Sequence, residues 1–361
     1  MASSGVLATA AFSRNGASRR AGVGRVKKTS SFERTLRYFC ITGFYFFFMF
    51  FSFGVAHSQD EAHPMKRRQQ GILTGMPFMA NITPRTFVDD AGRKLYIAKA
   101  PARVISLAPS ITEMLFALGL DEEIVGVTEF CNFPAAALNK PQLGYARPSL
   151  EALIALRPDL IVAPHEFLRA DMLAKLDELK IPVFLLKAQT LEDILIQIQN
   201  LGKIFNRMSA ADSITGVMRA RIAEVTNRVA PLERKRVLYV LNSHPLITVG
   251  PGSYIHQMIG LAGGINIAAG TSSPYPRLSL ESVLKEDPQV LIFPVGSAES
   301  IPESEQQEWN RWTTLSAVRN QQLRNVSSDA LNRPGPRVIE GLEHLARAIH
   351  PELSSATSAQ P

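Results

Sequence analysis

The chain has 361 residues, of which 46% are hydrophobic and 20% are charged. This composition is ordinary for a globular protein, and it excludes a chain disordered along its whole length, a collagen-like repeat and a disulfide-stapled scaffold. The formal charge of +7 suggests nucleic acid or an anionic surface as a partner, but residues 1–58 hold eight basic residues and one acid. The remainder is formally neutral, so we expect no nucleic-acid partner.

Residues 1–58 have the anatomy of a secretory signal. A basic stretch precedes the uncharged apolar run 38–56, and Ala56 and Ser58 then form a small-x-small exit typical of signal peptidase cleavage. The alternative is an uncleaved anchor, because about 19 residues at about 1.5 Å each just span a ~30 Å hydrocarbon core. Both interpretations predict an exported, periplasmic protein, tethered in the second case.

Only one of the two cysteines lies outside this leader. Cys40 lies inside it, so the exported part contains Cys131 alone and cannot form an internal disulfide. We therefore interpret Cys131 as a small packed residue or a pocket-lining group rather than a nucleophile.

Folded structure is predicted to begin after a linker at 59–84. Residues 85–88 and 94–97 have the composition of strands, and the turn-forming residues 89–92 separate them. This pattern is typical of a β-hairpin.

An alternation of strands and helices follows the hairpin. Residues 104–107 form a short apolar run, and Ser110 with Glu113 fits a capping box for a helix that stops at Gly119. The next apolar run, 124–127, predicts another strand. Such alternation indicates an α/β fold with a largely parallel sheet.

A repeated pattern predicts two similar lobes. Residues 148–164 (PSLEALIALRPDLIVAP) and 278–294 (LSLESVLKEDPQVLIFP) match without gaps at the pairs Ser149/Ser279, Leu150/Leu280, Glu151/Glu281, Pro158/Pro288 and Pro164/Pro294. In each copy a serine caps a helix, a glutamate sits in its first turn and a proline follows its end. Arg103 and Arg236 open strands at nearly the same offset, which favours duplication over the alternative of shared helix signals.

Between the repeats, residues 191–205 and 210–229 carry apolar residues at helical spacing. The second segment is about 30 Å long as a helix and can join the two lobes stiffly. We expect a signal peptide or anchor at 1–58, a linker at 59–84, an N-terminal α/β lobe at 85–205, an interlobe backbone helix at 206–232, a C-terminal α/β lobe at 233–352 and a flexible tail at 353–361.

Motifs of catalysis are missing from the sequence. It contains no GxSxG elbow, HExxH motif, Walker A loop or GxGxxG after a strand. Residues 260–264 are rich in glycine but fit the end of a helix, and His165, His244 and His256 lack the spacing of metal ligands. We therefore predict neither an enzyme nor a metal or cofactor site.

Five segments in consistent order resemble periplasmic binding proteins for vitamin B12 and ferric siderophores, which serve ABC importers: 103–120, 148–163, 252–268, 275–284 and 331–351. The resemblance implies two Rossmann-like lobes, each with a central sheet, joined by one long backbone helix (the class III, helical-backbone type). It implies a monomer that captures a metal chelate between its lobes and delivers it to a permease dimer with ATPase subunits.

In that family, one surface glutamate on each lobe docks into arginine pockets of the permease. Glu151 and Glu281 fall on those positions. Carboxylate–arginine contacts of this kind give orientation as well as attraction.

The resemblance also implies a ligand site in loops that follow strands at the facing edges of the lobes. Its candidate residues are Phe130, Cys131, Tyr145, Arg147, His165, Tyr275, Arg277, Arg333 and Arg337, with Glu166 and Asn332 as neighbours. Aromatic side chains at Phe130, Tyr145 and Tyr275 suit a corrin ring, although B12 receptors also use tryptophan there and Trp309 and Trp312 lie elsewhere.

Three ligand classes and one other role stay open. Cobalamin or another corrinoid is favoured. The arginines would suit an anionic ferric siderophore, and a tyrosine or histidine would suit haem iron. The alternative role is a membrane-anchored sensor of corrinoids or iron chelates without transport.

Overall fold

The computed structural model describes residues 85–144, 148–297 and 299–355. The predicted leader and linker, 1–84, and residues 356–361 lie outside the described residues. All of the described residues belong to one compact unit, Arg67–Pro361.

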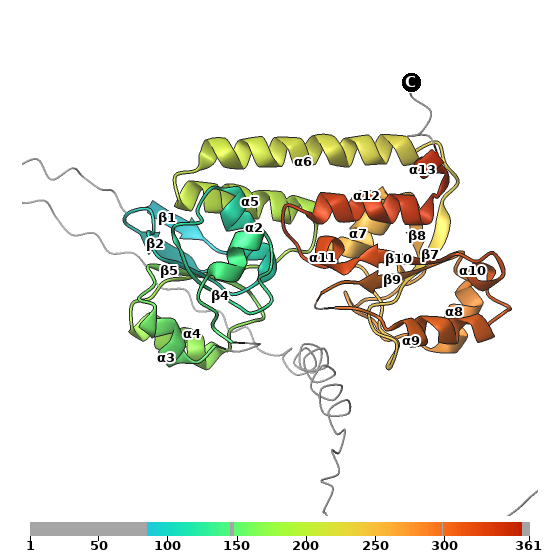
Figure 1. The fold of residues 1–361 in the computed structure, drawn as a ribbon, viewed down its shortest axis with the longest axis horizontal. Helices are drawn as coiled ribbons and strands as arrows, with labels where there is room; N and C mark the ends of the chain where they lie inside the picture. The colour runs from blue at the N-terminus through green and yellow to red at the C-terminus, as the bar shows by residue number, and fades with distance from the viewer. Residues whose placement is uncertain (1–84, 145–147, 298, 356–361) are drawn as a thin grey trace, which may run out of the picture. The chain divides into compact units, whose positions relative to one another are not determined.

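The first lobe is built on a parallel sheet of four strands in the order β4-β3-β5-β6 (Figure 1). Its strands are β3 (Val104–Ser106), β4 (Ile124–Val127), β5 (Leu160–Pro164) and β6 (Val183–Leu186). These strands are short and almost wholly buried because helices cover both faces of the sheet, as the continuous apolar runs of the sequence indicate.

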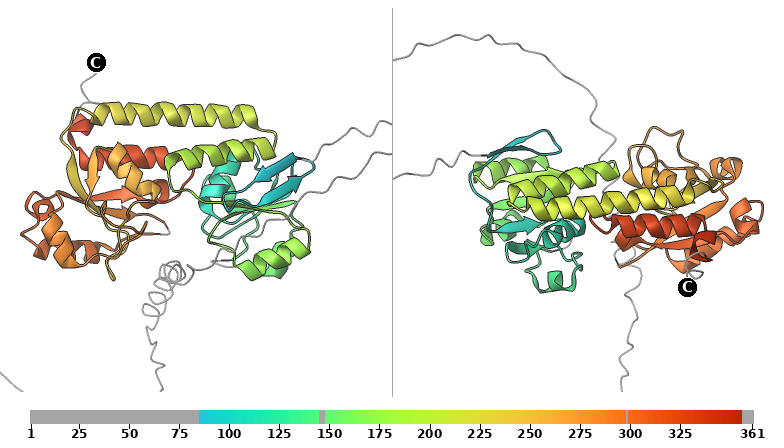
Figure 2. Two further views of the ribbon diagram at one scale, coloured as in Figure 1. Left: turned by 180° about the vertical axis from the view of Figure 1, so that it is seen from behind. Right: turned by 90° about the horizontal axis from the view of Figure 1, so that it is seen from above.

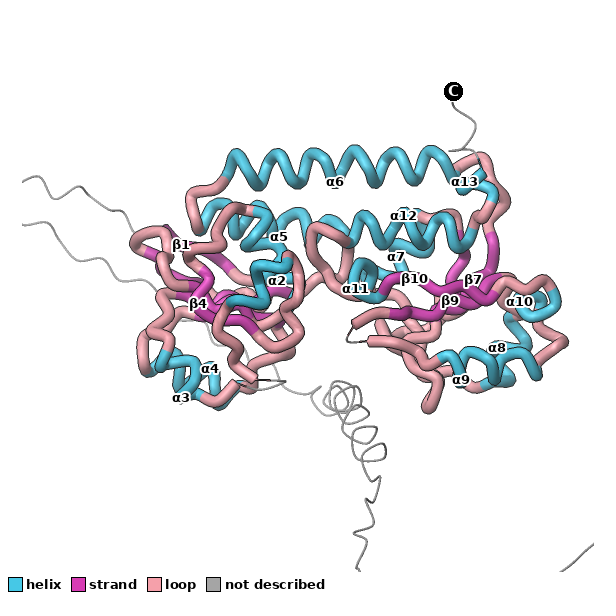
Figure 3. The backbone as a smooth tube through the Cα atoms, viewed as in Figure 1, coloured by secondary structure: helices cyan, strands magenta, loops and turns pink. Residues whose placement is uncertain are grey.

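The second lobe repeats this topology in the order β10-β9-β7-β8 (Figure 3). Its strands are β7 (Lys235–Tyr239), β8 (Gly264–Asn266), β9 (Val290–Val295) and β10 (Leu323–Ser327). Counted along the chain, each sheet places its second strand at one edge, its first strand next, and then its third and fourth. The identical order supports the prediction of two similar lobes.

Helices connect the strands in both lobes. Those of the first lobe are α2 (Pro109–Ala117), η2 (Ala135–Asn139), α3 (Leu150–Ala155), α4 (Ala170–Glu178) and α5 (Leu191–Ile204). Those of the second are α7 (Tyr254–Leu261), α8 (Leu280–Glu286), α9 (Glu303–Gln307), η3 (Glu308–Arg311), α10 (Ser316–Arg319), α11 (Ser328–Leu331), α12 (Val338–Ile349) and α13 (Glu352–Ser355).

The long helix α6 (Met208–Val229) joins the lobes, as Figures 1 and 2 show. It packs against α5 of the first lobe and against α7 and α12 of the second. Buried Ala211, Met218 and Val225 recur every seven residues along its inner face, and its 22 residues extend about 33 Å. The predicted fold class, two α/β lobes joined by one long helix, is confirmed.

The N-terminal hairpin forms as predicted. Strands β1 (Arg85–Val88) and β2 (Lys94–Ile97) pair antiparallel. The side chain of Asp89 accepts hydrogen bonds from the backbone N–H groups of Ala91 and Arg93, and Gly92 takes the positive φ of 77° that the turn needs.

Serines at equivalent positions cap equivalent helices in the two lobes. The hydroxyl of Ser149 caps α3 by accepting from the Ala152 N–H, and the hydroxyl of Ser279 caps α8 by accepting from the Ser282 N–H. The repeated serines are therefore helix caps, as the sequence predicts.

The arginines at the start of the first strand of each sheet also correspond, Arg103 directly before β3 and Arg236 as the second residue of β7. Nε of Arg103 donates to the carbonyls of Leu156 and Arg157 at the end of α3. Nε of Arg236 donates to the carbonyls of Glu286 and Asp287 at the end of α8. Each arginine thus satisfies carbonyls that the helix end leaves without intrahelical partners, so the likeness of the lobes extends beyond shared helix signals.

One local prediction is wrong. Helix α2 does not begin with a capping box at Ser110 and Glu113. Its N-cap is Ala108, two residues before Ser110, and Ala108 offers no side-chain cap; the first helical residue is Pro109. Proline suits this first position since it has no N–H to satisfy and its φ is already helical. The carboxylate of Glu113 is therefore free of the helix end and pairs with the second lobe instead.

The apolar core has one shared part and two separate parts. The shared part includes Leu115 and Leu195 of the first lobe, Met218 of α6, and Tyr239 and Ile339 of the second lobe. On the opposite face of each sheet, α3 and α4 close a core that belongs to the first lobe, and α8, η3 and α10 close another that belongs to the second. The lobes are therefore joined by packing as well as by chain connection.

Candidate ligand-binding and docking sites

A buried carboxylate of the first lobe receives two arginines of the second. Glu113 on α2 exposes 2% of its side chain. Arg337, which precedes α12, donates from Nε to Oε2 at 2.9 Å and from Nη2 to Oε1 at 2.6 Å. Arg333 approaches the same Oε1 with Nη1 at 3.5 Å. A two-pronged contact of this kind fixes orientation as well as distance.

Polar side chains extend this contact into an interlobe junction, defined here as Glu113, Asn132, Phe133, Ser297, Asp329, Arg333 and Arg337. Arg333 Nη1 donates to Asn132 Oδ1 at 2.7 Å, and Asn132 Nδ2 donates to Ser297 Oγ at 2.9 Å. Arg333 Nη2 also forms an ion pair with Asp329. Although burial opposes the effect, hydrogen bonds from Ser297 help to lower the pKa of Asp329 below its ordinary value.

Close packing accompanies the polar contacts. The guanidinium carbon of Arg337 lies 3.9 Å from the centroid of the Phe133 ring, a cation–π contact. The backbone of Gly335 approaches Ser110 so closely that a Cβ at position 335 would lie 3.1 Å from the Ser110 carbonyl oxygen. Arg333 and Arg337, which the sequence suggests as ligand contacts, are thus engaged by the protein itself.

Cys131 is fully buried in the first lobe. Thr112 Oγ1 donates to its sulfur at 3.1 Å, and Thr128 Oγ1 lies at 3.2 Å. Burial raises the pKa of the Cys131 thiol. The side chain has no accessible surface to offer a ligand, and its packed surroundings agree with the interpretation of Cys131 as a structural residue.

Other predicted ligand residues occupy loops of both lobes. Phe130 is half-buried, Arg277 is exposed, and His165 is half-buried directly after β5 with Nδ1 3.5 Å from Glu166 Oε1. Tyr145 and Arg147 lie outside the described residues.

Tyr275 lies in the second lobe between β8 and α8. It is half-buried and packs against the shared core. Burial, together with the nearby carboxylates of Glu166 from the first lobe and Glu299 from the second, raises the pKa of Tyr275. Of the predicted ligand residues, Arg333 and Arg337 both contact Glu113, whereas Cys131 is buried in the core.

Tyr239 and Glu299, which the sequence did not single out, complete this region together with Asn332. The Tyr239 hydroxyl donates to Asn332 Oδ1 at 2.6 Å, and Asn332 Nδ2 donates to Glu299 Oε2. Glu299 follows β9 at the carboxyl end of the sheet, where ligand-binding loops of α/β folds gather, so its position along the chain is a usable signal. Glu113 gave a weaker signal, since it is a single acidic residue on an otherwise uncharged helix.

The predicted docking glutamates are both exposed. Glu151 lies in the first turn of α3 and Glu281 in the first turn of α8, at matching positions of the two lobes. Hydrogen bonding from its own backbone N–H and then from the Ser149 hydroxyl lowers the pKa of Glu151. Both helices lie on the sheet face opposite the shared core (Figure 1).

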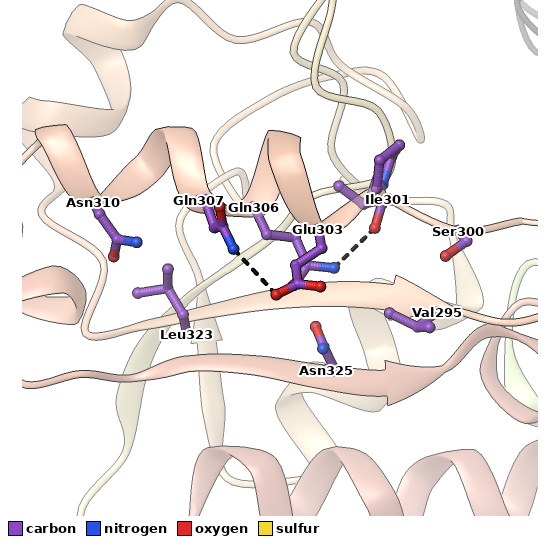
Figure 4. Close-up of a pocket in the computed structure, with 10 residues that line it drawn as sticks. Val295, Ser300, Ile301, Glu303, Gln306, Gln307, Asn310, Leu323 and Asn325 are labelled. Carbon is purple, nitrogen blue, oxygen red and sulfur yellow. Dashed lines mark hydrogen bonds between the residues drawn. The ribbon is translucent and has the colours of Figure 1, made fainter. Parts of the chain in front are cut away.

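A cavity of about 370 Å³ lies in the second lobe between α9 and the strands β9 and β10 (Figure 4). It is lined by Val295, Ser300, Ile301, Pro302, Glu303, Gln306, Gln307, Asn310, Leu323 and Asn325. Gln307 donates to Glu303, and Gln306 donates to the Ile301 carbonyl. None of the predicted ligand residues lines this cavity, so it is a separate feature of the second lobe.

In the part of the chain that the structure describes, no group of three or more His, Cys, Asp or Glu side chains is arranged to hold a metal ion. No helix there combines the length and apolar character that a membrane span requires.

The sequence is similar to proteins of known name. The chain is 32% identical over 245 residues to the vitamin B12-binding protein of Vibrio cholerae, which covers 67% of this chain and 87% of the relative. It is 30% identical over 283 residues to the cobalamin-binding protein of Halobacterium salinarum, covering 74% of each.

The fold is similar to solved structures as well. The crystal structure of the periplasmic vitamin B12 binding protein BtuF of Vibrio cholerae matches with a TM-score of 0.61 and 29% identity, covering 72% of this chain and 99% of that one. The family model described as "Periplasmic binding protein" matches residues 104–330, which include α6 and most of both lobes. The chain belongs to the periplasmic binding protein family.

Proposed function

We propose that this protein is the substrate-binding component of an ABC importer that captures cobalamin or another corrinoid. The observation that carries the proposal is the similarity to vitamin B12-binding proteins over most of their length. A fold of two matched lobes is suited to hold a bulky planar chelate between them. Such a protein binds and delivers its ligand without turning it over.

The proposed ligand site lies between the loops at the carboxyl ends of both sheets. Phe130 and His165 contribute from the first lobe, Tyr275 and Arg277 from the second, and Tyr145 and Arg147 belong to the proposed set by their place in the sequence. We assign Cys131 to the core because it is fully buried. We assign Arg333 and Arg337 to lobe positioning because Glu113 and Asp329 engage them.

The proposed partner is a permease dimer with ATPase subunits. Glu151 and Glu281 place one exposed carboxylate on each lobe at equivalent positions. Two arginine-lined pockets related by a two-fold axis would accept them in a defined orientation. The proposed location is the periplasm, reached through residues 1–58, and the mass of the mature protein would show whether that segment is removed.

Titration of the purified protein with cyanocobalamin tests the ligand. We expect saturable binding tighter than about 0.1 mM, equivalent to about −5.5 kcal/mol. Parallel titrations with a ferric siderophore and with haemin serve as comparisons. The corrinoid proposal is wrong if all corrinoids bind more weakly than this limit, and saturable haemin or siderophore binding would then identify the ligand class.

Haem is the second candidate because two groups capable of binding haem iron, His165 and Tyr275, lie in loops of the two lobes near Glu166. A shift of the haemin Soret band on binding, lost in Tyr275→Phe or in His165→Ala, would support it.

A further inference from the structure

The cavity between α9 and the strands β9 and β10 has no part in the proposed function (Figure 4). Its volume of about 370 Å³ falls within the range of about 300–1,000 Å³ that is usual for small-molecule sites. The cavity therefore has room for a small molecule of its own.

Well-anchored elements form the walls of this cavity. Leu323 and Asn325 belong to β10, which pairs in parallel with β9. On the opposite wall, Ile301 is buried, and its backbone N–H donates to the Pro294 carbonyl at 3.0 Å. Trp309, in the helical turn η3 that continues from α9, is buried in the same apolar cluster as Ile301. The packing of the protein itself thus holds both walls in place.

Amide side chains supply most of the polar groups in the lining. Gln307 donates to Glu303 Oε1 at 3.1 Å, and Gln306 donates to a backbone carbonyl at 2.8 Å. The side chains of Asn310 and Asn325 make no hydrogen bond to any other residue that the structure describes. Since each amide offers a carbonyl oxygen and two N–H groups, all four retain hydrogen-bonding capacity for a ligand.

The charge of the lining limits the kind of ligand. Among the described residues that line the cavity, Glu303 alone has an ionisable side chain. Without a lysine or an arginine, the lining has no charged group to pair with a phosphate or carboxylate. Glu303 Oε1 already accepts from Gln307, so only part of one carboxylate is left for a cation. An uncharged ligand fits this lining best.

Apolar side chains make up the rest of the lining, and they are Val295, Ile301, Pro302 and Leu323. The cavity thus combines an apolar surface with groups that both donate and accept hydrogen bonds. A sugar ring has the same two-sided character, because its C–H groups form an apolar face and each of its hydroxyls donates and accepts. The oxygen and the NH₂ group of one amide can together bind two neighbouring hydroxyls.

We propose that this cavity is a second binding site and that it binds a small uncharged polyhydroxy molecule, a monosaccharide. Asn310 and Asn325 bind hydroxyls of the sugar, and Ile301 and Leu323 pack against its C–H face. The inference goes beyond the proposed function and does not depend on it.

Intrinsic fluorescence reports on this cavity. Trp309 and Trp312 are the two tryptophans of the chain. Trp309 shares a buried cluster with Ile301, and Trp312 and Leu323 pack against that cluster. Titration of the purified protein with D-glucose, D-galactose and N-acetyl-D-glucosamine should give a saturable change for at least one sugar, with a Kd of about 1 mM or tighter. If none of the three saturates below about 10 mM, the proposal is wrong.

Amide-to-leucine variants assign the binding to residues. Asn310→Leu and Asn325→Leu should each weaken sugar binding about tenfold, because leucine has a similar size but makes no hydrogen bond. Asn227→Leu on the exposed side of α6 is the matched control and should bind like the wild type. Unchanged sugar binding in both cavity variants, with thermal melts showing that they are folded, would overturn the assignment.

A charge-neutral variant separates a sugar from a cation. Glu303→Gln keeps an acceptor oxygen at this position, so sugar binding should weaken less than about threefold. Spermidine serves as the cationic probe. Saturable spermidine binding that is lost in Glu303→Gln, without binding of any sugar, would overturn the proposal.

Dialysis with cyanocobalamin separates this cavity from the proposed chelate site. In Asn310→Leu and Asn325→Leu, the affinity for cyanocobalamin should change less than about twofold, since neither residue belongs to the proposed chelate site. A parallel loss of sugar and cyanocobalamin binding would contradict a second, separate site. If cyanocobalamin does not bind the wild-type protein, the corrinoid proposal is wrong, and the sugar titrations still decide the role of the cavity.

Discussion

Glu113 holds the two lobes in contact through a side chain that is almost fully buried. Its carboxylate is removed from water and compensated by Arg337 and Arg333 from the other lobe. A buried ion pair contributes little net stability relative to apolar packing, but removal of one partner leaves a buried charge without compensation. Removal of the Glu113 carboxylate should therefore reduce stability by more than the intact ion pair contributes to it.

The substitution Glu113→Gln tests how much the Glu113 carboxylate contributes to stability. We expect the free energy of unfolding to fall by about 3 kcal/mol, since Arg333 and Arg337 would lose their shared anion. Urea denaturation followed by circular dichroism measures it. Glu343→Gln, which breaks the partly exposed pair with Arg221, is the control and should cost under about 1 kcal/mol. Equal losses in the two variants would contradict the role given to Glu113.

At the scale of elements, close packing of helices is set by glycine at particular positions. A Cβ at Gly341 on α12 would lie 2.8 Å from the carbonyl oxygen of Ala330 and 2.8 Å from the Cα of Leu331, both on α11. Gly216 on α6 is exposed, and a Cβ there would meet nothing within 4 Å. The same substitution should therefore have opposite effects at these two sites.

Gly341→Ala should lower the free energy of unfolding by about 1–3 kcal/mol, because the backbone of α11 must move away. Gly216→Ala should raise it by about 0.5–1 kcal/mol, because alanine loses less conformational entropy than glycine in a helix. Chemical denaturation of both variants measures the difference. A stabilising Gly341→Ala would show that α11 and α12 pack less closely than described.

Local patterns in the sequence predicted the elements well, because turns, caps and apolar runs act over a few residues. The hairpin of β1 and β2, the strand β4 and the serine caps of α3 and α8 all follow from such patterns. Glu113 was misread as a capping residue because its true partner, Arg337, lies 224 positions away. The carboxylate of Glu299 was missed for the same reason, since its neighbours Asn332 and Tyr239 are distant in sequence.

At the scale of the whole molecule, the duplicated lobes present duplicated docking groups. Glu151 and Glu281 sit on helices that match in cap, first turn and position against the sheet. Neither residue contributes to the shared core or to the interlobe junction. Their substitution should therefore change contact with a partner and leave the fold intact.

Glu151→Lys and Glu281→Lys should each abolish uptake of the ligand by cells while ligand affinity changes less than about twofold. A reversed charge would face the arginines of the proposed permease pockets and repel them. Uptake of radiolabelled cobalamin and dialysis of the purified variants measure the two quantities. Glu286→Lys on the same helix as Glu281 is the control and should transport normally. Normal transport by both docking variants would contradict the proposed orientation on the permease.

The core that continues from the first lobe through α6 into the second has a consequence for how cargo leaves. Because apolar side chains of both lobes pack into one continuous interior, a wide hinge motion would expose that interior to water and cost free energy in proportion to the area exposed. Wide spontaneous opening is therefore disfavoured. In the proposed importer, the free energy for separating the lobes would have to come from binding to the permease and from ATP hydrolysis by its ATPase subunits.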